Sequence, residues 1–67
     1  MKLTLIDLDE KKVIYDIDDG KGTIEVNLDT DEKIVNTENL TEDVINKAYK
    51  KILWYKKLDN FFEHGVI

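Results

Sequence analysis

Carboxylates are the most numerous groups in this chain that could do chemistry, and they are dense around Asp16-Ile17-Asp18-Asp19-Gly20, with Glu25 beyond. A calcium-binding loop between two helices has acids at alternate positions, a glycine directly after the third acid and a glutamate further on. Here the glycine comes too early, and the flanking residues favour strands instead of helices. We therefore expect a hairpin turn and no resident metal ion, with weak calcium binding at Asp16, Asp18 and Glu25 as an alternative.

Other catalytic groups are scarce. The sequence contains neither Ser nor Cys, and its one histidine, His64, stands at the end of a predicted helix, where an imidazolium suits the negative end of the helix dipole. A mechanism with two carboxylates needs a cleft that raises the pKa of one of them, and a chain of 67 residues has little room for a cleft. We expect no enzymatic activity, no cofactor and a single domain spanning residues 1–67.

The first part of the chain, residues 1–37, has the pattern of an antiparallel sheet. Apolar and polar residues alternate in three segments, and the short polar turns between them are typical of a β-meander. The glycines of Asp19-Gly20-Lys21-Gly22 supply the positive φ angles of a hairpin turn. The predicted strands run from Lys2 to Leu8, from Lys12 to Asp18, from Thr23 to Asp29 and, for a short fourth strand, from Ile34 to Thr37.

A four-residue loop at positions 19–22 sets the register of the predicted sheet. It places Asp16 opposite Glu25, and like charges that lie directly opposite each other destabilise a sheet. A three-residue loop at the preceding turn places Ile6 beside Ile14. The face of the sheet away from the helix is therefore predicted to carry Ile6, Leu8 and Ile14 next to Asp16, Asp18 and Glu25.

Residues 41–64 have the pattern of one amphipathic helix. Thr41 is a suitable N-cap, and Gly65 suits the left-handed position that follows a last helical turn, which leaves residues 65–67 as a tail. We expect the helix to pack on one face of the meander of three or four strands, which makes the fold class α+β. The predicted core contains Leu3, Leu5, Val13, Tyr15, Ile17, Ile24, Val26, Leu28, Val44, Ile45, Ala48, Tyr49 and Ile52.

A second apolar group on the predicted helix lies away from its main stripe. Trp54, Leu58 and Phe61 are placed together among lysines by the period of the helix. Three interpretations are open: these side chains pack under a loop or on the C-terminal tail, they bind a partner, or they line a small-molecule site.

Charge and composition narrow the class of partner. The net charge is −5, and residues 1–40 carry eleven acids against five lysines, so the sheet part is acidic. Arginine, the usual residue for bidentate recognition of bases and phosphates, is absent, which argues against specific nucleic-acid binding. The sequence has no apolar run of membrane-spanning length and no signal-peptide pattern, so we expect a cytoplasmic protein without membrane contact.

Together these features predict a small acidic protein–protein interaction module that acts by contact, as a monomer or as a homodimer. Its candidate binding residues are Trp54, Leu58 and Phe61 on the helix, and Asp16, Asp18, Glu25, Ile6 and Ile14 on the open face of the sheet. The alternative is an acidic inhibitor of the phage or plasmid type, which would mimic nucleic acid and occupy the basic groove of a DNA-processing enzyme.

Overall fold

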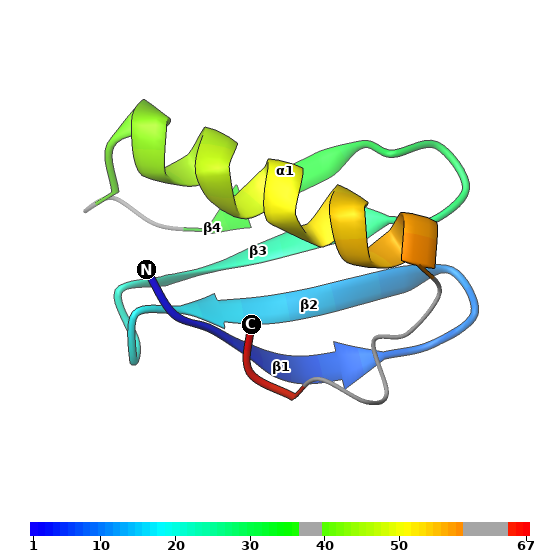
Figure 1. Cartoon of the computed structure of the whole chain (residues 1–67), viewed down its shortest axis with the longest axis horizontal. Coiled ribbons are helices and arrows are strands. Elements are labelled where there is room, and N and C mark those ends of the chain that lie inside the picture. Colours follow the sequence, from blue (N-terminus) through cyan, green and yellow to red (C-terminus); the bar gives the residue numbers. More distant parts are fainter. Residues whose placement is uncertain (37–39, 59–64) are drawn as a thin grey trace.

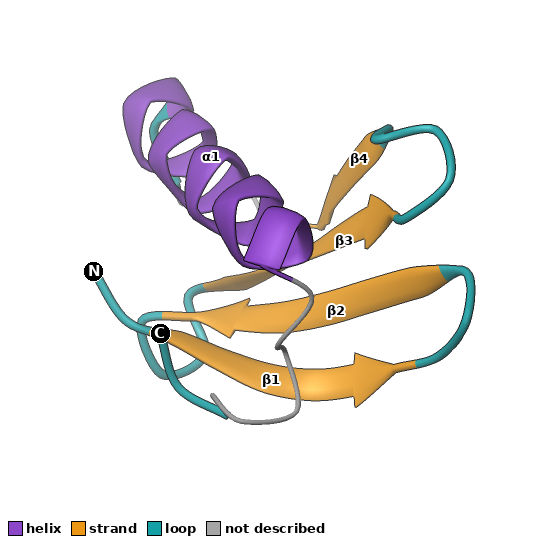
Figure 2. Ribbon diagram, turned by 45° about the vertical axis from the view of Figure 1, so that its right-hand side comes forward, coloured by secondary structure: helices purple, strands orange, loops and turns teal. Residues whose placement is uncertain are grey.

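A computed structural model describes residues 1–36, 40–58 and 65–67 of the chain. Within these ranges, four antiparallel strands form one sheet in the order β1-β2-β3-β4, and one helix, α1, lies across one of its faces (Figures 1 and 2). The predicted α+β fold, a meander followed by a helix that packs on the sheet, is confirmed. The elements are β1 (Leu3–Leu8), β2 (Lys12–Ile17), β3 (Gly22–Asn27), β4 (Lys33–Asn36) and α1 (Glu42–Leu58).

The core lies between α1 and the sheet, where alternate residues of the strands point toward the helix. Val13, Tyr15 and Ile17 alternate along β2, and Ile24 and Val26 alternate along β3. Every fully buried apolar residue in the described ranges was among those predicted: Leu3, Val13, Tyr15, Ile17, Ile24, Val26, Ala48 and Ile52. Six further side chains that were not predicted also pack against this cluster: Leu8, Val35, Leu40, Leu53, Tyr55 and Ile67.

A β-bulge in β1 changes which residues reach the open face. Thr4 lies opposite Asp16 as predicted, but the register then shifts, so that Asp7 and not Ile6 pairs with Ile14. The extra residue of the bulge is Ile6. Leu8 was predicted to lie on the open face, and this prediction is wrong. Leu8 lies opposite Val13 and packs against the core.

The turn between β2 and β3 begins one residue earlier than predicted. Asp18 and Asp19 take positive φ angles of 48° and 58°, and Gly20 follows at 101°, so residues 18–21 form the loop and β3 starts at Gly22. Aspartate tolerates the left-handed region better than most residues, and this let the turn start before the glycine. The predicted opposition of Asp16 and Glu25 is consequently wrong, because Asp16 lies opposite Thr23.

The last three residues of the chain, residues 65–67, pair with the outer edge of β1. Leu3 and Ile67 exchange both of their backbone hydrogen bonds, at 2.9 and 2.8 Å, and the N–H of Leu5 donates to the carbonyl of Gly65 at 2.7 Å. Gly65 does not adopt the left-handed conformation that we expected after the helix. The tail therefore serves as a short strand-like cover for β1.

The helix begins as the sequence predicts. The hydroxyl of Thr41 accepts a hydrogen bond from the backbone N–H of Val44 at 3.3 Å, and the acids Glu42 and Asp43 lie in the first turn. The predicted continuation of the helix through residues 59–64, which includes His64, lies outside the described residues.

The β1–β2 turn yields a prediction about acid. Asp9 Oδ1 accepts hydrogen bonds from the backbone N–H groups of Lys11 at 2.7 Å and Lys12 at 2.9 Å. These bonds, that of Lys11 first, hold the pKa of Asp9 below its usual 3.8. Because folding lowers this pKa, the stabilisation is present above a pH of about 4 and is lost as the pH falls through the folded-state pKa.

The check is a carboxyl-carbon NMR titration of the folded protein, in which the midpoint of Asp9 should fall below 3.8. The variant Asp9→Asn should remove that titration step, whereas Glu10→Gln in the same turn should leave the midpoint of Asp9 in place. A midpoint at or above 3.8 would mean that the two backbone bonds do not persist in solution.

Candidate functional site

Among the described elements, α1 covers one face of the sheet and no helix covers the opposite face (Figure 2). We call it the open face. Its residues follow from the strand register and from the alternation of side chains along each strand. They are Thr4, Asp7, Lys12, Ile14, Asp16, Thr23, Glu25, Asn27, Ile34 and Asn36. We count with them the exposed bulge residue Ile6, which has no cross-strand partner.

Apolar side chains on the open face lie along one line across the sheet. Asp7, Ile14, Glu25 and Ile34 are successive cross-strand neighbours from β1 to β4, and the bulge residue Ile6 adjoins Asp7. Ile6 is 56% exposed and Ile34 is 63% exposed, which is unusual for isoleucine in a sheet. The sequence predicted Ile6 and Ile14 here but missed Ile34 and Asp7. The alternation of β4 could have indicated Ile34, since the next residue, Val35, packs against the core and adjacent residues of a strand point to opposite faces.

The charges of the open face are mostly negative. The face carries three acids, Asp7, Asp16 and Glu25, and one lysine, Lys12. The ammonium of Lys12 lies 3.9 Å from a carboxylate oxygen of Glu25. Both ends of this ion pair are partly exposed, so it contributes little to stability. The face therefore combines apolar groups with a net negative charge.

The prediction that Asp18 lies on the open face is wrong. Asp18 lies in the β2–β3 loop, and its carboxylate accepts a backbone hydrogen bond. Its Oδ1 accepts a hydrogen bond from the backbone N–H of Lys2 at 2.7 Å. In the same way Asp16 Oδ2 accepts from the N–H of Gly20 at 3.0 Å. In the part of the chain that the structure describes, no three acidic or histidine side chains gather as ligands for a metal ion.

The candidate helix surface is placed only in part. Trp54 is 57% exposed and Leu58 is 49% exposed, so neither is covered by the described residues. The third predicted member, Phe61, lies outside the described residues. Among the described residues, this surface has one large aromatic ring, that of Trp54, and it stays more than half exposed.

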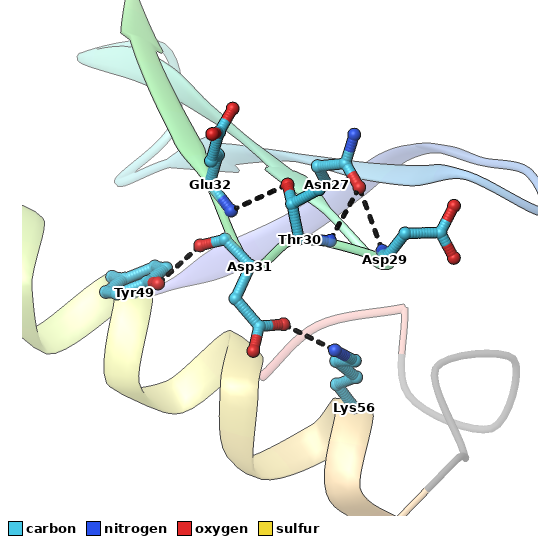
Figure 3. A network of polar contacts seen from close by, with 7 residues as sticks. All are labelled: Asn27, Asp29, Thr30, Asp31, Glu32, Tyr49 and Lys56. Carbon is cyan, nitrogen blue, oxygen red and sulfur yellow. Dashed lines mark hydrogen bonds and ion pairs between the residues drawn. The ribbon is translucent and has the colours of Figure 1, made fainter.

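A polar network fixes the β3–β4 loop against α1 (Figure 3). Asn27 Oδ1 accepts hydrogen bonds from the backbone N–H groups of Asp29 and Thr30, at 2.8 and 3.0 Å. The hydroxyl of Tyr49 donates to the carbonyl of Asp31, and Lys56 forms an ion pair with the Asp31 carboxylate. Two groups of the helix thus hold one loop residue, and the loop in turn sets the position of β4.

The buried phenol of Tyr15 is a poor candidate for chemistry. It lies in the core beneath α1, and burial, with a smaller effect of Tyr55, raises its pKa to about 12. The phenol therefore stays protonated at neutral pH and is shielded from a substrate by the helix.

No protein-family model, curated protein or solved structure matches the chain. None of the helices in the described ranges is long and apolar enough to cross a membrane.

Proposed function

We propose that this domain is a protein-binding module that works by contact, without catalysis, through its open face. The observation that supports the proposal best is the exposure of Ile6 and Ile34 on a sheet face that α1 leaves free. Exposed apolar groups rimmed by polar ones are typical of protein–protein contact sites.

The partner that this surface suits is a protein patch with apolar groups flanked by lysine or arginine. Ile6 and Ile14 offer neighbouring apolar contacts, and Asp7, Asp16 and Glu25 offer carboxylates on the same face. Opposite charges at such an interface raise the association rate and select the partner more than they raise affinity. The lack of cysteine suits a reducing compartment, and we propose a cytoplasmic location.

The test is capture of proteins from a bacterial lysate on the immobilised domain, quantified by mass spectrometry. We expect specific proteins to be retained by the wild type and by Trp54→Ala, and to be lost from the double variant Ile6→Asn and Ile14→Thr. Circular dichroism of each variant must show the wild-type fold. Retention by the double variant with loss from Trp54→Ala would assign the function to the helix surface instead.

A second candidate is the acidic inhibitor that mimics nucleic acid. It is favoured by one observation: the backbone N–H of Leu28 donates to the carbonyl of Lys11 at 2.7 Å, which joins the β1–β2 and β3–β4 loops at one end of the sheet. The acids brought to that end are Asp9, Glu10, Asp29, Asp31 and Glu32.

Salt separates the two candidates. A mimic that occupies a basic groove would be released steeply as ionic strength rises, whereas a contact centred on isoleucines would persist. Neutralising Asp29 and Glu32 as Asp29→Asn and Glu32→Gln should weaken only a mimic. If capture proves insensitive to both salt and these substitutions, mimicry is excluded.

A further inference from the structure

In the part of the chain that the structure describes, the outer side of β4 is an unpaired strand edge. The other outer strand, β1, is covered by the tail, whereas β4 pairs only with β3 among the described residues. Unpaired strand edges present N–H and C=O groups that can bond another strand. We call the outer side of Lys33, Ile34, Val35 and Asn36 the β4 edge.

The register shows which backbone groups the β4 edge presents. The N–H of Asn27 donates to the carbonyl of Glu32 at 2.8 Å, across the start of the β3–β4 ladder. Bonded and non-bonded pairs alternate in an antiparallel ladder, so Ile34 and Asn36 bond inward to β3. The N–H and C=O groups of Lys33 and Val35 therefore point outward.

Several devices that commonly protect an edge are missing from β4 or are engaged elsewhere. β4 pairs with β3 without a register shift, and the sequence contains no proline. The ammonium of Lys33 lies on the helix side, 4.7 Å from the centre of the Tyr49 ring and 3.4 Å from Asn46 Oδ1. Ile34 is the most exposed large apolar side chain among the described residues.

We propose that two copies of this chain pair through their β4 edges, antiparallel, about a two-fold axis at Ile34. In this register Lys33 and Val35 of one copy bond Val35 and Lys33 of the second copy, and the two Ile34 side chains face each other on the open face. The two sheets then form one continuous sheet, with both helices on the same side. This inference does not depend on the proposed function.

A second copy suits the β4 edge because the pairing sets no like charges opposite each other. Glu32 lies opposite Asn36 of the second copy, Lys33 lies opposite Val35, and isoleucine lies opposite isoleucine. Cross-strand apolar pairs stabilise a sheet, and like charges directly opposite destabilise it. The strand is short, so a weak, concentration-dependent dimer is expected.

The test is analytical ultracentrifugation over a concentration series of the wild type, Ile34→Lys and Ile6→Lys. The Ile34→Lys ammonium lies opposite Glu25 in its own chain, which favours folding, but opposite its own copy across the two-fold, which opposes pairing. We expect Ile34→Lys to weaken dimerisation at least about tenfold. Ile6→Lys, the same substitution on β1, should leave dimerisation within about twofold of the wild type.

Amide hydrogen exchange of the wild type supplies a second measurement that needs no variant. The amides of Lys33 and Val35 should exchange more slowly as the protein concentration rises. The proposal is overturned if the wild type stays monomeric up to about 1 mM. It is also overturned if Ile34→Lys dimerises as well as the wild type, or if Ile6→Lys disrupts the dimer more than Ile34→Lys does.

Discussion

Replacing Ile52 with alanine is expected to remove about half of the free energy of unfolding of this domain. Ile52 is a fully buried side chain of α1 and packs in the core between the helix and the sheet. Removing its methyl and methylene groups costs about 2–5 kcal/mol through lost burial and the cavity that remains. A domain of this size has a total free energy of unfolding of about 3–10 kcal/mol.

The measurement is urea denaturation followed by circular dichroism. Trp54→Ala on the same helix is the matched control, and because Trp54 is exposed its free energy of unfolding should change by no more than about 0.5 kcal/mol. A loss for Ile52→Ala that is no larger than the loss for Trp54→Ala would mean that α1 does not turn this side toward the sheet.

Two single-residue deletions, of Ile14 in β2 and of Ile6 in β1, are expected to have opposite effects on folding. Without Ile14, Val13 and Tyr15 become neighbours and must point to opposite faces, so β2 cannot bury both and folding is lost. Without Ile6, the bulge disappears, and Leu3, Leu5 and Leu8 fall on alternate positions that all face the core. The second deletion should therefore retain the fold.

Circular dichroism and amide dispersion in an NMR spectrum distinguish these outcomes for the two deletion variants. The Ile6 deletion should change the free energy of unfolding by about 1 kcal/mol or less, since a bulged, exposed residue adds little packing. Loss of the fold in the Ile6 deletion, or its survival in the Ile14 deletion, would contradict the register of β1 against β2.

Alternation along β2 and β3 made the core predictable from the sequence. Val13, Tyr15 and Ile17 are separated by polar or half-exposed residues, and only one face of such a strand can be buried. The helix start was equally predictable, because threonine is a favoured N-cap residue and acids are favoured in the first turn.

The register was not predictable from glycine positions alone. Asp18 and Asp19 adopt the left-handed region without glycine, so the loop starts at Asp18 and each predicted cross-strand partner in β3 moves by two positions. A register shift of two residues keeps every side chain on its face of the sheet. The predicted core residues of β2 and β3 are therefore correct, whereas the predicted opposition of Asp16 and Glu25 is wrong. The pairing of residues 65–67 with β1 was missed because no local pattern marks a contact between distant segments.

The candidate site was predictable where it depends on strand alternation and not where it depends on turns. Ile14, Asp16 and Glu25 reach the open face as predicted. Ile6 is exposed, but it lies in a bulge that the sequence did not predict. Asp18 does not reach the open face, because its side chain accepts a backbone hydrogen bond from Lys2 in the loop.

We expect the outer edge of β1 to be closed last during folding. Each hairpin of the sheet joins neighbouring segments, whereas Leu3 and Ile67 are separated by almost the whole chain. Contacts between distant residues form more slowly because more chain entropy is lost when they meet. Until residues 65–67 dock, β1 offers a bare edge to other partly folded chains, so crowding and slow docking would together promote aggregation at this edge.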